Sequence, residues 1–167
     1  MNLYIDFGGT HFRYQLNDSK IKTLNSDNID LKKFLDEMIQ KHSDISYIGI
    51  SFAGIVQNGK IISSPNTNTQ NFAVKKYIKE TYNIPLAIDN DLNCAALAEH
   101  NALQVSSLAV FYIGTGCGSA FIDNNRLIKG ANNKSGEMRH IPFKKSPFKW
   151  GWGKKHCLEL YVEWKRY

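Results

Sequence analysis

Apolar residues in the first half of the chain follow two different periods. Three segments rich in Ile, Tyr and Phe, and bounded by Gly, Asn and Asp, have the pattern of β-strands: residues 3–6, 12–16 and 47–53. Between the second and the third of them, apolar residues recur at the spacing of one helix face, at Leu31, Phe34, Leu35, Met38 and Ile39. The pattern predicts strands with an amphipathic helix between them, which is typical of an α/β fold.

The second half of the chain predicts a similar mixture of elements. We expect a helix at residues 72–80, a short strand at 86–88 and an alanine-rich helix from about 91 to 102. The segments SSLAVFYIG and GSAFI then have the pattern of buried strands on either side of a glycine-rich turn, and NNR predicts a hairpin turn. We expect a domain boundary near residue 105, where the third helix gives way to new strands.

Length and composition limit the classes of protein that fit. The 167 residues, 43% of them hydrophobic, suffice for one compact domain or for a small domain and part of another. No run approaches the roughly 18 apolar residues of a membrane span, and the start MNLYIDFGGT lacks a signal-peptide layout. We therefore expect a cytoplasmic protein without a membrane partner. The three scattered cysteines predict reduced thiols, and the dispersed net charge of +6 favours a solvated surface over a nucleic-acid partner.

The stretch DFGGTHFR, from Asp6 to Arg13, is the first with candidate chemistry. Asp6 ends a predicted strand, and Gly8, Gly9 and Thr10 form the turn into the next one. Adjacent glycines let backbone N–H groups approach a phosphate, Thr10 adds a hydroxyl, and Asp6 can face a phosphate-bound Mg²⁺. By itself, however, the motif fits an ordinary tight hairpin better.

A second glycine-rich turn, GTGCGS, lies between two apolar segments. Its candidates for phosphate binding are Gly114, Thr115, Gly116 and Gly118. Two such turns in one chain, each after a strand, indicate paired phosphate loops from two halves of a nucleotide site. Neither fits the P-loop pattern or opens a helix as the dinucleotide fingerprint requires, so both of those site classes are disfavoured.

A third candidate lies in IDNDLNCAALAEH, where Asp89, Asn90 and Asp91 join a short strand to the alanine-rich helix. Asp and Asn are common N-caps, and an acidic first turn suits the helix dipole, so plain capping explains these residues as well as a function does. The functional interpretation uses the same geometry, because a carboxylate fixed at the start of a helix can accept a proton from a substrate hydroxyl.

Five segments, taken in order, resemble the ROK family of repressors, open reading frames and sugar kinases. They are DFGGT, SFAGIV with SSPN, DNDLNCAALAE, IGTGCGSAF and KGANNKSGEMRH. The resemblance covers nearly the whole chain and implies the actin-like ATPase (ribonuclease H-like) fold. It implies Asp91 as the catalytic base and the two glycine-rich turns as loops for ATP with Mg²⁺. It also implies contacts to a hexose or N-acetylhexosamine from Gly54, Asn66, Asn90, Glu137, His140 and Glu159.

The segment KWGWGKKHC departs from the family pattern. By the resemblance, family members hold a structural zinc with the signature histidine and three cysteines, whose positions here carry His140, Trp150, Trp152 and Cys157. Tryptophan has no lone pair that can replace a thiolate, and His156 beside Cys157 would be a poor substitute ligand, so we expect no structural zinc. Further departures are His11, Ser119 and Arg139, the last of which stands where the family signature has glycine.

The resemblance predicts a complete N-terminal lobe at residues 1–105 and a truncated second lobe at residues 106–167. We expect the N-terminal portion of an ATP-dependent sugar kinase, and a non-catalytic sugar-binding fragment or pseudokinase stays the alternative. A repressor is disfavoured because no helix-turn-helix precedes NLYIDFGGT. Truncation would leave one apolar face open, which predicts self-association or a separately encoded second half. The residues expected on that face are Phe111, Ile113, Phe121 and Ile122.

Overall fold

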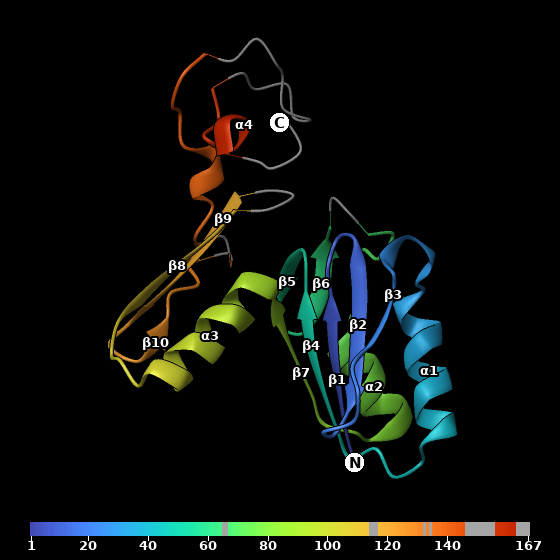
Figure 1. The fold of residues 1–167 in the computed structure, drawn as a ribbon. Helices are drawn as coiled ribbons and strands as arrows, with labels where there is room; N and C mark the ends of the chain where they lie inside the picture. Colours follow the sequence, from blue (N-terminus) through green and yellow to red (C-terminus); the bar gives the residue numbers. More distant parts are fainter. Residues whose placement is uncertain (65–66, 114–116, 132, 134, 146–155, 163–167) are drawn as a thin grey trace. The chain divides into compact units, whose positions relative to one another are not determined.

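The structure, a computed structural model, describes residues 1–64, 67–113, 117–131, 133, 135–145 and 156–162 (Figure 1). Its contacts divide the chain into two compact units, Met1–Cys94 and Ala95–Tyr167, and the division falls within helix α3 (Asp91–Leu103). The sequence placed the boundary after this helix, near residue 105. The assignment of the two parts to lobes stays a prediction, and each unit is described here by itself.

Unit 1, Met1–Cys94, is built on a five-stranded sheet in the order β3-β2-β1-β4-β7. Its strands are β1 (Asn2–Phe7), β2 (His11–Leu16), β3 (Lys22–Asn25), β4 (Tyr47–Phe52) and β7 (Leu86–Asn90). The first three strands pair antiparallel, whereas β4 runs parallel to β1 and to β7. The unit also contains helices α1 (Leu31–Lys41) and α2 (Val74–Tyr82), the 3₁₀ turn η1 (Ser26–Asn28), and a hairpin of β5 (Ile55–Gln57) and β6 (Lys60–Ser63).

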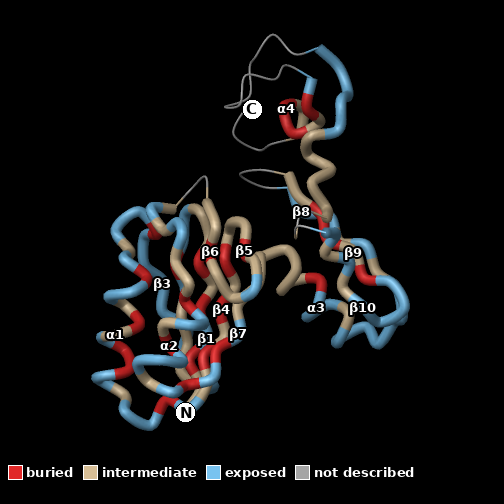
Figure 2. Tube along the Cα trace, turned by 180° about the vertical axis from the view of Figure 1, so that it is seen from behind, coloured by how far each residue is buried: buried red, intermediate tan, exposed pale blue. Residues whose placement is uncertain are grey.

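One face of this sheet packs against the helices and forms the core of unit 1, as the buried segments in Figure 2 show. Every second residue of β1 and β4 is buried, which is the pattern of strands with one covered face. Helix α1 contributes four buried residues at the spacing that the sequence predicted: Leu31, Leu35, Met38 and Ile39. The uncovered face is therefore the one that carries the alternate residues of β1 and β4, and these include polar side chains at the ends of the strands.

Unit 2, Ala95–Tyr167, contains an antiparallel sheet in the order β10-β9-β8. Its strands are β8 (Leu108–Ile113), β9 (Cys117–Asp123) and β10 (Arg126–Leu127), and its other described elements are the 3₁₀ turn η2 (Met138–His140), the helix α4 (Glu159–Val162) and part of α3. Asn124 and Asn125 have φ of 48° and 61°, which confirms the hairpin turn predicted at NNR. None of the helices in the described ranges has the length and apolar character that crossing a membrane requires.

The apolar face expected in unit 2 is partly wrong. Phe111 and Ile113 on β8 are 58% and 60% exposed, as expected of an uncovered face. Ile122, however, is buried. Neighbouring residues of a strand point to opposite faces, so Ile122 does not share the face of Phe121. Association through Phe111 and Ile113 stays a prediction.

Candidate active site

Strand register brings four polar residues of unit 1 into one row across the sheet. Asp6 on β1 stands opposite Arg13 on β2 and Ser51 on β4, and Ser51 stands opposite Asp89 on β7. Residues paired in this way point to the same face. Arg13 Nη1 lies 3.1 Å from Asp6 Oδ2, and Ser51 Oγ donates to Asp6 Oδ1 at 3.3 Å. The predicted Mg²⁺-facing carboxylate therefore already has a cationic partner.

The turn that follows Asp6 is held from one side by η1. Ser26 Oγ donates to the Gly8 carbonyl at 2.7 Å, and the Ser26 N–H donates to the Thr10 carbonyl at 3.2 Å. The Gly8 N–H donates to the His11 carbonyl at 3.0 Å, so the turn itself uses this donor and does not offer it to a phosphate. Thr10 is exposed and Gly9 half-buried. Hydroxyl and carboxylate oxygens are ligands that suit a Mg²⁺-bound phosphate, and Thr10 and Asp6 are the residues of this segment that would hold it.

Asn90 fixes the start of α3 in unit 1. Its Oδ1 accepts from the N–H groups of Leu92 and Asn93, at 3.0 and 3.3 Å, and so caps the helix. Its Nδ2 donates to the Gly54 carbonyl at 3.1 Å. An added Cβ at Gly54 would lie 2.5 Å from the Ser63 carbonyl oxygen, so glycine is required for the chain to pass here. The predicted capping role of Asn90 is thereby confirmed, and its side chain also ties α3 to the loop after β4.

Asp91, the predicted base, is the first residue of α3. Burial raises the pKa of its carboxyl above the usual value, and the negative charge of Asp6 adds to the rise, against hydrogen bonds that lower it. Burial also raises the pKa of the nearby Cys94 thiol to about 11, with further contributions from the charges of Asp89 and Asp91. A carboxylate that is costly to ionise is a stronger proton acceptor than an exposed one, and the neighbouring thiol stays protonated.

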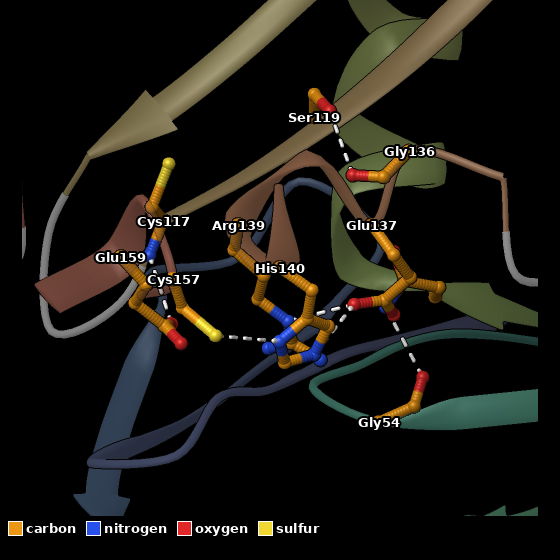
Figure 3. Close-up of polar contacts among 10 residues, drawn as sticks. Gly54, Cys117, Ser119, Gly136, Glu137, Arg139, His140, Cys157 and Glu159 are labelled. Carbon is orange, nitrogen blue, oxygen red and sulfur yellow. Dashed lines mark hydrogen bonds and ion pairs between the residues drawn. The ribbon is translucent and has the colours of Figure 1, made fainter. Parts of the chain in front are cut away.

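Three predicted sugar-contacting residues lie in unit 2, and two of them gather at η2 (Figure 3). Glu137 Oε2 accepts from Arg139 Nε at 2.7 Å and lies 3.6 Å from His140 Nε2. The turn is anchored on β9, because Ser119 Oγ donates to the Gly136 carbonyl at 2.7 Å. The side chain of Arg139 therefore points toward Glu137.

Glu159, the third of these residues, is held deep in unit 2. It is 3% exposed, and its Oε1 accepts from the Cys117 N–H at 3.3 Å. Its Oε2 is buried and has no hydrogen-bond donor among the described residues. A buried carboxylate oxygen without a donor has lost its hydration without replacement, and a sugar hydroxyl is a donor that can supply the missing bond.

Of the four positions at which the family resemblance implies zinc ligands, His140 and Cys157 lie among the described residues. Cys157 Sγ lies 3.9 Å from His140 Nδ1, so two of the four positions come together. Trp150 and Trp152 lie outside the described residues. Within the part of the chain that the structure describes, no group of three or more His, Cys, Asp or Glu side chains could hold a metal ion. Two donors do not close a tetrahedral zinc site, and the absence of zinc stays a prediction.

Other predicted residues lie outside the described ranges. These are Asn66 and most of the second phosphate loop, Gly114, Thr115 and Gly116. Gly118 is described and pairs with Tyr112 in the β8–β9 ladder. Sequence reasoning missed Arg13, Ser51 and Asp89 as members of the polar row. Their place depends on strand register, for which the segment pattern carries no signal.

A family model described as the ROK family matches residues 3–163. The chain belongs to the ROK family. Its curated relatives include the xylose repressor of Bacillus spizizenii (strain ATCC 23059 / NRRL B-14472 / W23), 33% identical over 79% of this chain and 35% of the repressor. They also include a glucokinase of Halalkalibacterium halodurans (strain ATCC BAA-125 / DSM 18197 / FERM 7344 / JCM 9153 / C-125), 30% identical over 75% of this chain and 41% of that enzyme.

Solved structures confirm the expected fold. A ROK family glucokinase from Streptomyces griseus, crystallised with glucose and AMPPNP, superposes with a TM-score of 0.76 at 21% identity, over 97% of this chain and 57% of its own length. ROK sugar kinases have the actin-like ATPase fold, so the fold predicted for this ROK chain is confirmed. The chain spans between about a third and three fifths of the length of these relatives.

Proposed function

We propose that this chain carries the base and the sugar-contacting residues of a ROK-type sugar kinase, with a hexose or N-acetylhexosamine as phosphate acceptor. The observation that carries the proposal is Asp91, a carboxylate at the start of α3 whose pKa is raised by burial and by Asp6. Phosphoryl transfer to a hydroxyl requires a group that accepts the hydroxyl proton, and a base with a raised pKa performs this step better than an exposed carboxylate.

Each described residue has a defined part in this function. Asp91 accepts the proton of the attacking sugar hydroxyl, and Asn90, tied to Gly54, keeps the start of α3 in place. Glu137, His140 and Glu159 contact sugar hydroxyls, and Glu159 Oε2, which has no donor within the described part of the chain, supports this role. ATP with Mg²⁺ would supply the phosphoryl group when bound, and Asp6, Gly9 and Thr10 are the residues of the first turn that would hold it.

A second candidate function is sugar binding without phosphoryl transfer. Two observations favour it: a xylose repressor is among the relatives, and Asp6 is paired with Arg13 instead of being free for a metal ion. The two functions share the sugar contacts and differ in whether Asp91 acts on the sugar.

The test is ADP release by the 167-residue chain over a panel of hexoses and N-acetylhexosamines, run beside calorimetry of sugar binding. If the chain is a kinase, Asp91→Asn lowers turnover by about 10²-fold or more and keeps sugar affinity within severalfold, because an amide cannot accept the proton. Glu99→Gln, the same loss of charge at an exposed position of α3, serves as the matched control and leaves turnover unchanged.

The outcomes separate the two candidates. Sugar-dependent ADP release that survives Asp91→Asn removes Asp91 from the mechanism. Sugar binding without ADP release in the wild-type chain supports the second candidate. An absence of binding for every sugar in the panel contradicts both.

A further inference from the structure

An ion pair lies within the set of residues that the proposed function assigns to the sugar. Arg139 Nε donates to Glu137 Oε2 at 2.7 Å, a short, charge-assisted hydrogen bond (Figure 3). The two side chains are 30% and 36% exposed, so the pair is only partly shielded from water. One oxygen of a proposed sugar-contacting carboxylate is thus already occupied by a cation of the same chain.

The backbone around η2 holds Glu137 and Arg139 close together. Gly136 has φ of +84°, and a Cβ there would overlap the Ser119 carbonyl, so the chain turns tightly against β9 just before Glu137. The His140 N–H donates to the Glu137 carbonyl at 3.1 Å, which closes the η2 turn around Arg139. Glu137 and Arg139 are therefore held two residues apart on one short turn, with their side chains directed toward each other.

The positive charge of Arg139 also acts on a side chain of strand β9. Burial and the charge of Glu159 raise the pKa of the Cys117 thiol, and Arg139 opposes them. The guanidinium thus lies close enough to act on β9, whose Cys117 N–H binds Glu159. Arg139 is therefore bonded to Glu137, and its charge acts on the same β9 residue whose N–H binds Glu159.

We propose that Arg139 is a specificity-determining residue that discriminates against neutral hexoses by competing with their hydroxyls for Glu137. This inference rests on the proposed function, in which Glu137 contacts the sugar. A neutral hydroxyl that takes the place of the guanidinium N–H at Glu137 Oε2 offers a weaker, uncharged hydrogen bond in return. The cost of breaking the ion pair is subtracted from the binding energy of every neutral sugar that uses this oxygen.

The test is calorimetry of glucose binding to the full chain with Arg139→Met, which keeps an unbranched apolar stem and removes the guanidinium. The affinity for glucose is expected to rise about 1.5- to fivefold, the range for breaking a partly exposed ion pair. Arg139→Lys retains the charge and is expected to retain most of the discrimination. Circular dichroism and the melting temperature establish that each variant is folded.

The dependence of glucose affinity on ionic strength tests whether Arg139 competes for Glu137, because a purely structural role of Arg139 would not make this affinity depend on salt. Salt screens the Arg139–Glu137 pair, so glucose binds the wild-type chain more tightly as salt is raised, whereas its affinity for Arg139→Met does not change with salt. Glu137→Gln, which removes the other partner, also abolishes the salt dependence.

Several outcomes overturn the inference and leave the proposed function intact. Glucose affinity that is equal or weaker in Arg139→Met shows that Arg139 does not compete for Glu137. Tighter wild-type binding of glucuronate than of glucose, lost in Arg139→Met, shows that Arg139 recruits an anionic sugar instead. Failure of the wild-type chain and all three variants to bind any hexose or N-acetylhexosamine contradicts the proposed function itself, and the inference with it.

Discussion

Replacing Gly54 by alanine disturbs the contact that positions the start of α3. The added Cβ would lie 2.5 Å from the Ser63 carbonyl oxygen, 2.6 Å from Phe52 Cε1 and 3.0 Å from Ser64 Cβ. None of these atoms can move easily. Phe52 is fully buried and packs edge-on against Phe7 at 5.5 Å, and Ser64 Oγ is bonded to the Ala53 carbonyl at 2.7 Å.

The backbone must therefore shift, and the Gly54 carbonyl that accepts from Asn90 shifts with it. Overpacking of this kind costs about 1–3 kcal/mol. In a unit of this size about 1 kcal/mol lowers the melting temperature by roughly 4–8 °C, so a fall on the order of 10 °C is expected. Sugar binding should weaken as well, because Asn90 is one of the proposed sugar contacts.

Gly49→Ala is the matched control in the preceding strand. Its Cβ would meet Tyr4 Cδ1 at 3.2 Å, but that ring is 43% exposed and can yield. The control should keep the wild-type melting temperature or gain slightly from reduced freedom of the unfolded chain. Thermal unfolding followed by circular dichroism, with glucose calorimetry, makes the comparison. Equal melting temperatures for Gly54→Ala and Gly49→Ala would refute the reasoning.

Three further predictions concern charge and metal. Asp36 Oδ1 accepts from Tyr77 and Tyr82 at 2.7 and 2.8 Å, so Asp36→Ala should cost about 1–3 kcal/mol of unfolding free energy, measured in urea. Burial raises the pKa of Asp36, but the hydrogen bonds from Tyr77, Lys32 and Tyr82 outweigh it and hold the pKa below its ordinary 3.8. The stability lost in Asp36→Ala should therefore shrink as the pH falls below that value. The pKa of Asp91 is raised, so its ionisation disfavours folding above pH 3.8, and Asp91→Asn should melt higher than wild type at neutral pH, by an amount that vanishes in acid. Elemental analysis should find well under one zinc per chain, and a chelator should leave the melting temperature unchanged; stoichiometric zinc would contradict this.

Much of unit 1 could be predicted from the sequence because its signals are local. The buried face of α1, the strands and the cap at Asn90 follow from periodicity and from residue types over a few positions. The hairpin of β5 and β6 was missed, although its Asn58-Gly59 turn, with φ of 50° and 78°, is a recognisable signal. Strand β3 is exposed at every position and has no apolar pattern to detect.

The remaining features depend on contacts between distant segments. The row of Arg13, Asp6, Ser51 and Asp89 arises from the register of four strands, which no single segment encodes. The ion pair of Arg139 with Glu137 depends on how the η2 turn rests on β9. The sequence marked Arg139 as a departure from the family signature, and the structure shows where its charge is directed.

The measurement that tests the central proposal most directly is calorimetry of glucose binding to the 167-residue chain, wild type against Glu159→Gln. The buried Glu159 Oε2 lacks a donor among the described residues, and the proposal makes a sugar hydroxyl that donor. Saturable binding by the wild-type chain is expected, weakened about 10-fold or more in Glu159→Gln because a hydrogen bond to a charged group is lost. Equal glucose affinity of the two folded proteins, or no binding of any hexose or N-acetylhexosamine by the wild type, would contradict the account.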